Sequence, residues 1–180
     1  VLRNTITGNS TTFYGIMLTG VSGTASLPAR FENNVIIGQN SGQAAINVMA
    51  GTCSYLDILH NSISFTGGTT GQGITMVLGS GTGTRISNNA VRTPGPALRV
   101  EPASRVSASD GNVLLGTNIN AVWWGTAWHY DLPSLVAASG MNGNSLMVDP
   151  SFVNTTSDLH PQPGSACAGR GVNIPTITTD

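Results

Sequence analysis

Short runs in which apolar and polar residues alternate recur along the first two thirds of the chain. Alternation places every second side chain on one face, so these segments are typical of half-buried β-strands. Loops rich in Gly, Ser and Thr separate them, and no segment before residue 131 keeps the 3.6-residue period of an amphipathic helix. The clearest runs are residues 15–18, 45–48, 73–77 and 97–100.

An asparagine recurs at a nearly fixed position between such runs. Each copy stands two residues before an apolar residue, as in "FENNVIIG", where Asn34 precedes Ile36. The spacings between successive copies are 30, 27, 28 and 23 residues, which indicates a repeat architecture. The five asparagines are Asn4, Asn34, Asn61, Asn89 and Asn112.

Three short strands in each repeat predict an all-β fold, a parallel β-helix whose coils stack at about 4.8 Å. Asparagine suits a corner between strands because it tolerates the left-handed conformation and can bond to the adjacent coil. We therefore expect the repeated asparagines to form a structural ladder rather than a catalytic group. The β-helix is expected in residues 1–125, as four to five coils, and residues 126–180 are expected to form a cap of the same domain.

The predicted core contains the apolar residues that flank each asparagine and those of the alternating runs. These residues are Ile6, Ile16, Leu18, Phe31, Ile36, Ile46, Val48, Ile58, Ile63, Ile74, Met76, Ile86, Val91, Leu98 and Val100.

A short helix is predicted in the cap. Asp131 can cap a helix that begins at Leu132, and Gly140 can end it. A solenoid has to cover its last coil, so we expect the nearby tryptophans to pack beneath this cap rather than to form a platform for a sugar. The tryptophans are Trp123, Trp124 and Trp128.

The segment "YDLPSLVAASGMNGNSLMVDPSFV", followed by "DLHPQPGSACAGRGVN", resembles one that often closes extracellular bacterial β-helix proteins. Together with the repeats, it makes the chain similar to right-handed parallel β-helix proteins of the pectate-lyase-like superfamily. The resemblance implies a right-handed β-helix and an extracellular or cell-surface location. It implies no single activity, because one fold hosts many functions.

Charged residues are unusually sparse, at 8% of the chain against roughly 25% in typical globular domains. The chain has seven arginines and no lysine, and its net charge is -1. Such a chain lacks the basic surface that nucleic acid needs. Its longest apolar runs are far shorter than the roughly 20 residues that cross a bilayer, so no membrane span is expected.

Residues 1–8, "VLRNTITG", already have the pattern of a coil, with no cap before them. The open strand edges of such a coil invite pairing with another chain. We expect either upstream residues or another subunit to cover it, and self-association is therefore one expected property.

Candidate chemistry centres on charged residues that precede the asparagines. Arg30, Asp57 and Arg85 occupy the same repeat position, which predicts an outward ion-pair ladder or a grip on the carboxylate of an acidic sugar. Glu32 should lie about 8 Å from Asp57, within the range for the carboxyl pair of an inverting glycosidase. His60 could act as an acid or base, or could simply be a polar surface residue.

The sequence indicates no metal site and no cofactor, because it has no nucleotide loop, zinc-type cysteine pair or calcium cluster. Cys53 and Cys167 are either two separate thiols or one disulfide. Asn9 and Asn154 stand in glycosylation tripeptides of a kind that arises by chance in such a chain.

The favoured functional prediction is an exported, non-enzymatic surface or fibre-forming scaffold that contacts glycans as a secondary role. The alternative is a hydrolase or lyase acting on an acidic polysaccharide, with Glu32 and Asp57 as its catalytic candidates and Arg30 and Arg85 on the substrate carboxylate.

Overall fold

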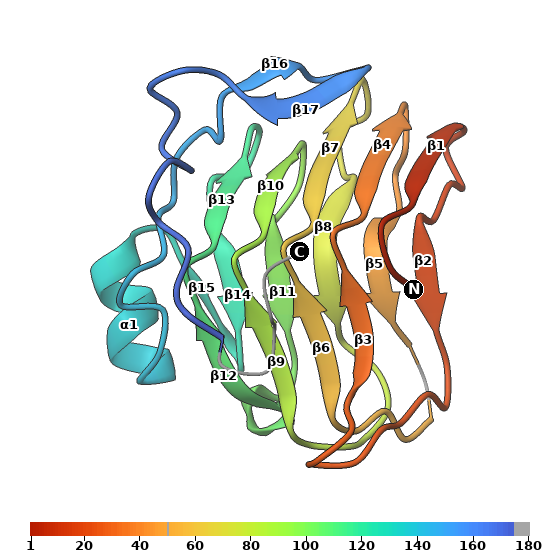
Figure 1. Ribbon diagram of the computed structural model, residues 1–180, viewed down its shortest axis with the longest axis vertical. Coiled ribbons are helices and arrows are strands. Elements are labelled where there is room, and N and C mark those ends of the chain that lie inside the picture. The colour runs from red at the N-terminus through yellow and green to blue at the C-terminus, as the bar shows by residue number, and fades with distance from the viewer. Residues whose placement is uncertain (50, 175–180) are drawn as a thin grey trace.

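The protein is a parallel β-solenoid of about four turns, seen in a computed structural model that describes residues 1–49 and 51–174 (Figure 1). Three parallel sheets run along the axis, and each coil contributes one strand to each sheet in turn. The predicted all-β class is confirmed. The end of the predicted cap, residues 175–180, lies outside the described residues.

The strands of the three sheets come from successive coils. Sheet A contains β3 (Ala29–Glu32), β6 (Leu56–Leu59), β9 (Thr84–Ser87) and β12 (Val106–Asp110). Sheet B contains β1 (Thr5–Asn9), β4 (Val35–Gln39), β7 (Ser62–Thr66), β10 (Ala90–Thr93) and β13 (Val113–Gly116). Sheet C contains β2 (Ile16–Leu18), β5 (Ala44–Val48), β8 (Gln72–Met76), β11 (Leu98–Val100), β14 (Val122–Trp124) and the antiparallel β15 (Ala127–His129).

The interior is a stack of aliphatic side chains in register. Ile36 lies beside Ile63, and Ile63 beside Val91, so each coil places a similar side chain at the same depth. Full burial of one such side chain contributes about 1.5–3 kcal/mol. All predicted core residues are buried except Ile6, which is partly buried and packs against the core from the first coil.

The asparagines occupy the corner between sheet A and sheet B and form a continuous hydrogen-bonded ladder. The Nδ2 group of Asn34 donates to Oδ1 of Asn61 at 2.9 Å, and that of Asn61 donates to Oδ1 of Asn89 at 3.0 Å. At the two ends of the ladder, Nδ2 of Asn4 donates to Oδ1 of Asn34 at 3.1 Å, and Nδ2 of Asn89 donates to Oδ1 of Asn112 at 3.0 Å.

The left-handed residue of each corner is the one before the ladder asparagine, so that part of the prediction was wrong. The φ angle is 53° at Asn33, 55° at His60, 58° at Asn88 and 66° at Gly111. This division has a physical reason, because the left-handed residue makes the bend while the next side chain turns inward and reaches the adjacent coil.

The last coil is closed by the cap. Helix α1 (Leu132–Ser139) is capped at its start by Asp131, whose carboxylate accepts a hydrogen bond from the Ser134 backbone at 2.8 Å, and at its end by left-handed Gly140, as predicted. Beyond the helix, the hydroxyl of Ser145 accepts a bond from the backbone of Asn112 at 3.1 Å and so extends the ladder into the cap.

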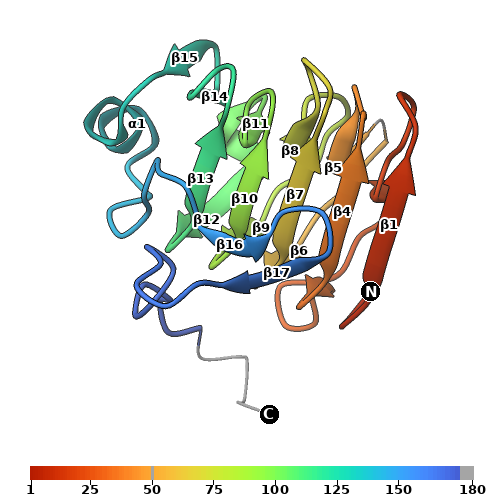
Figure 2. The ribbon, with the colours of Figure 1, turned by 90° about the horizontal axis from the view of Figure 1, so that it is seen from above.

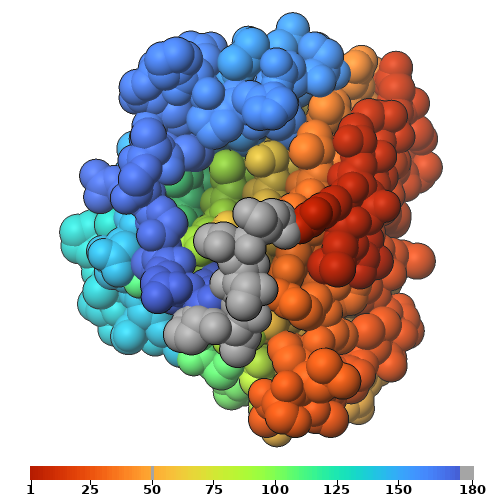
Figure 3. Space-filling view, in the orientation of Figure 1, coloured from red at the N-terminus to blue at the C-terminus, as the bar shows by residue number. Residues whose placement is uncertain are grey.

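A hairpin then crosses the outer face of sheet B (Figure 2). It consists of β16 (Phe152–Asn154) and β17 (Asp158–Pro161) and buries Phe152 and Leu159 against Ile37. In the space-filling view the hairpin and the residues after it, in blue, lie across the upper left of the molecule (Figure 3). Among the described residues no helix is long and apolar enough to cross a membrane.

We predict that Asn61→Ala lowers the free energy of unfolding by about 3 kcal/mol or more, because it leaves several buried polar groups without partners. Asn4→Ala, at the exposed end of the ladder, should cost less than about 1 kcal/mol. Urea unfolding measures both, and equal midpoints for the two variants would contradict the structural role of the ladder.

Candidate functional site

The charged row of sheet A has the predicted register. Arg30 lies beside Asp57, and Asp57 lies beside Arg85. Arg85 grips Asp57 through two nitrogens, with Nε to Oδ1 at 2.6 Å and Nη2 to Oδ2 at 2.5 Å, and this bond raises the pKa of Arg85. Asp57 is only 1% exposed, so the carboxylate is a buried anion held by a guanidinium.

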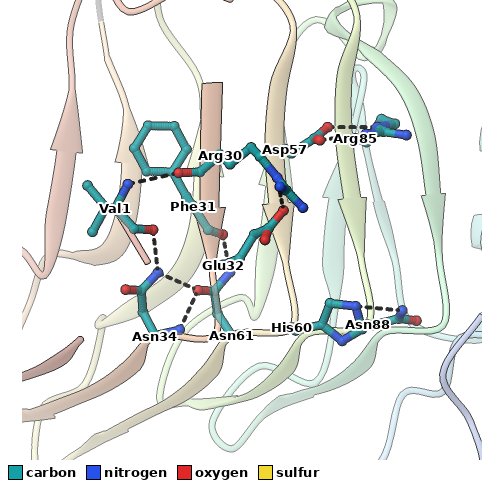
Figure 4. A network of polar contacts seen from close by, with 10 residues as sticks. All are labelled: Val1, Arg30, Phe31, Glu32, Asn34, Asp57, His60, Asn61, Arg85 and Asn88. Atoms are coloured by element: carbon teal, nitrogen blue, oxygen red, sulfur yellow. Dashed lines mark hydrogen bonds and ion pairs between the residues drawn. The ribbon is translucent and has the colours of Figure 1, made fainter. Parts of the chain in front are cut away.

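Arg30 does not continue this ladder. Its Nε donates to Oε1 of Glu32 at 2.6 Å, within the same strand, so Arg30 stacks on Asp57 as predicted but the predicted ion-pair ladder is wrong at this residue (Figure 4). Residues two apart on a strand share one face, so Glu32 competes for Arg30, while Asp57 is already held by Arg85. The row therefore contains two separate pairs.

These ion pairs leave few carboxylate oxygens of Glu32 and Asp57 available for acid–base chemistry. A guanidinium has only donors, so it occupies acceptor oxygens of a carboxylate that would have to carry or collect protons. Asp57 and Arg85 line a cavity of about 240 Å³ with Tyr55 and Ser107. Glu32 is 5% exposed and does not line this cavity, so the cavity presents the carboxyl of Asp57 without that of Glu32.

His60 occupies the left-handed corner of its coil and lies near the C-terminal segment that follows the hairpin, which includes residues 167–172. Its Nε2 lies 3.4 Å from Nδ2 of Asn88, and Asn88 holds the backbone of Val172 through bonds of 2.8 and 2.9 Å. Burial lowers the pKa of His60, and the charge of Glu32 opposes this shift. The surroundings therefore favour neutral imidazole, in a cavity of about 170 Å³ that Cys167 and Arg170 also line.

Both cysteines are free thiols, so the disulfide considered for Cys53 and Cys167 is absent. Cys53 is buried in the core, whereas Cys167 lies in the C-terminal segment, where burial raises its thiol pKa. Within the described part of the chain, no group of three or more His, Cys, Asp or Glu side chains could hold a metal ion.

A different surface, the outer face of sheet C, brings polar side chains together in register. Asn47 lies beside Thr75, Thr75 beside Arg99, and Arg99 beside Trp123. The hydroxyl of Thr75 donates to Oδ1 of Asn47 at 2.7 Å. Three neighbouring coils thus place an amide, a largely buried hydroxyl and a guanidinium in one line along the solenoid.

This line borders a cavity of about 210 Å³. Two of the residues that line it each carry a buried polar atom without a hydrogen-bond partner among the described residues, namely Nε of Arg99 and Oε1 of Gln72. Buried polar groups are normally paired, so an unpaired donor and an unpaired acceptor in one cavity indicate a place for a polar ligand. The lining residues are Tyr14, Gln43, Ala44, Asn47, Met49, Gln72, Thr75, Val77, Leu78 and Arg99.

The three tryptophans lie on β14 and β15, the last two strands of sheet C, and only one of them packs in the core as predicted. Trp124 is buried in the core beneath the cap, whereas Trp123 is partly exposed and Trp128 is 37% exposed. The alternation along β14 explains the difference, because neighbouring residues of a strand point to opposite faces. The prediction for Trp123 and Trp128 was therefore wrong.

Sequence reasoning missed the sheet C face, although a signal was present. Asn47, Thr75 and Arg99 are the outward residues between the apolar pairs of three alternating runs. The inward residues of these runs predict the core. The outward residues of the same runs, aligned in the same way, predict the polar line.

Comparison with known proteins adds no relative, since no family model, no curated protein and no solved structure matches the chain. The candidate sites therefore depend on geometry alone.

We predict that Asp57→Asn lowers the free energy of unfolding by about 3 kcal/mol, because it removes a buried carboxylate that accepts two hydrogen bonds from the partly buried guanidinium of Arg85. The control is Asp158→Asn, which breaks the exposed pair with His160 and should leave the urea midpoint unchanged. If Asp158→Asn lowered the free energy of unfolding as much as Asp57→Asn does, burial of Asp57 would not account for the stability that its ion pair contributes.

We also predict that acidification weakens the fold through His60. The pKa of His60 is below its ordinary value of 6.5 in the folded protein, so its contribution to stability is complete above pH 6.5 and is lost as the pH falls through the folded pKa. His60→Asn should fold, because Asn33 and Asn88 hold the same left-handed position in neighbouring coils. Thermal unfolding between pH 7 and pH 5 should show a smaller loss in this variant than in the wild type, and parallel curves would contradict the assignment.

Proposed function

We propose that the protein is an exported, non-enzymatic β-solenoid module that binds a glycan on the outer face of sheet C. The single observation that carries this proposal is the cavity of about 210 Å³ lined by Arg99 and Gln72, whose buried Nε and Oε1 atoms have no partner in the part of the chain that the structure describes. The hydroxyl groups of a sugar both donate and accept, so a sugar in the cavity matches the guanidinium of Arg99 and the amide of Gln72. Amides and hydroxyls around the cavity add further bonds of the same kind.

Binding rather than catalysis is supported by the state of the acidic residues. Glu32 and Asp57 are bound to Arg30 and Arg85 on a different sheet, away from the sheet C cavity. Within the described residues, the lining of the sheet C cavity contains no carboxyl group. A hydrolase acting in this cavity would have to obtain its acid and base from elsewhere.

Membership of the pectate-lyase-like superfamily and an extracellular location belong to the same proposal. The solenoid, its asparagine ladder and its terminal helix support the first. A chain with 8% charged residues, whose polar surface depends on hydroxyls and amides, suits the second. Fibre formation stays a prediction, which analytical ultracentrifugation and electron microscopy of the protein test.

The test is a glycan panel that contains neutral and acidic polysaccharides, read by affinity electrophoresis. Arg99→Met and Gln72→Leu should each weaken binding by roughly fivefold or more, because a hydrogen bond to a charged or buried group is worth about 1–3 kcal/mol. Arg92→Met is the matched control, since Arg92 lies on sheet B and bonds to Asp149.

Two results would contradict the proposal. One is the absence of binding across the panel, and the other is binding that both sheet C variants retain. Release of reducing ends or unsaturated uronides that is lost in Asp57→Asn would favour the enzymatic alternative instead.

A further inference from the structure

We propose that the sheet C face extends to an aromatic platform at Trp128, and that its ligand is a neutral oligosaccharide long enough to reach from the cavity to this ring. The inference rests on the proposed glycan binding and deepens it by naming the class and the length of the ligand. In the register of sheet C, four residues lie side by side on four successive strands, namely Thr75, Arg99, Trp123 and Trp128.

The two tryptophans are held in fixed positions relative to the polar line. Their rings meet edge to face, with centroids 5.0 Å apart and planes at 81°. The guanidinium of Arg99 lies 5.8 Å from the ring centroid of Trp123, and Nε1 of Trp123 donates to the carbonyl of Gly125 at 3.2 Å. Trp123 is thus a positioning residue that supports the more exposed Trp128.

An exposed indole beside a polar cavity suits a sugar. One side of a pyranose ring presents mainly C–H groups, which pack on an aromatic face, while the hydroxyls at its rim make hydrogen bonds. Trp128 can supply the apolar contact, and the cavity supplies the polar ones. The two parts serve one ligand only if that ligand spans the distance between them.

The strand spacing sets this distance. Thr75 and Trp128 are three strand positions apart, which corresponds to roughly 14 Å at about 4.8 Å per step. A single hexose is shorter than this span, whereas a chain of a few sugars is long enough. The face therefore selects an oligosaccharide, or a stretch of a polysaccharide, that lies along the solenoid axis.

The charges on the face favour a neutral sugar over an acidic one. Arg99 is the one charged residue that lines the cavity in the described part of the chain, and Glu101 lies beside it, with Oε2 3.8 Å from Nη2. Glu101 offsets the charge that would attract a uronate and would repel its carboxylate. The other polar lining groups are amides and hydroxyls, which match sugar hydroxyls.

The experiment measures binding of cello-, xylo- and manno-oligosaccharides of one to six units by titration calorimetry and tryptophan fluorescence. Oligogalacturonides of the same lengths are the acidic comparison. We expect at least one neutral series to bind, with affinity that rises over the first three or four units and a change in fluorescence. Trp128→Ala should weaken the longer oligomers roughly tenfold and leave the shortest ones unchanged.

Two further variants keep the test specific. Trp128→Phe retains an aromatic face and should recover most of the affinity of the longer oligomers. Tyr130→Ala removes another exposed aromatic ring of the same region, outside the register of the polar line, and should bind as the wild type does.

The outcomes separate this inference from the proposed function. If Arg99→Met loses binding while Trp128→Ala keeps it at every length, the platform is overturned and the glycan site stands. If oligogalacturonides bind and all neutral series fail, the ligand class is overturned. If no saccharide binds to the folded wild type, the proposed function falls, and this inference falls with it.

Discussion

The side-chain amide of one asparagine per coil holds this solenoid in register. In the buried corner, each ladder amide donates to the next coil and accepts from the previous one, so it satisfies polar groups that would otherwise be costly to bury. The backbone of the same residue also donates to the amide of the next coil, for example from Asn61 to Asn89 at 3.0 Å. A coil that slipped by one residue would lose all of these bonds together.

Fixed register determines what happens on the outer faces. Because every coil stacks at the same phase, residues 23 to 30 positions apart in the chain become neighbours along one line. On sheet A this brings Asp57 to Arg85 and produces a partly buried ion pair. On sheet C it brings Asn47, Thr75 and Arg99 together beside a cavity. The ladder thus positions both candidate sites without taking part in either.

The sparse charges of the chain are mostly engaged with one another. Arg30, Arg85, Arg92 and Arg99 each lie within 4 Å of a carboxylate. Arg105 differs, since it is only 1% exposed and its Nη1 donates to the carbonyl of Leu78 at 2.8 Å, while burial lowers its pKa. With the charges engaged in this way, hydroxyls and amides form much of the surface that can meet a partner, which agrees with recognition of an uncharged, hydroxyl-rich ligand.

The sequence by itself determined the β-solenoid, the repeat, the core and the cap helix, because each depends on local alternation or on a period that can be read along the chain. It could not decide which residue of each corner turns left-handed, nor which of Trp123 and Trp124 faces the core, because those outcomes depend on the phase of each strand. The pairing of Arg30 with Glu32 instead of Asp57 was decided by competition among side chains on adjacent coils. The sheet C cavity likewise exists only in the tertiary structure, since Gln72 and Arg99 belong to different coils and line one cavity only when those coils stack.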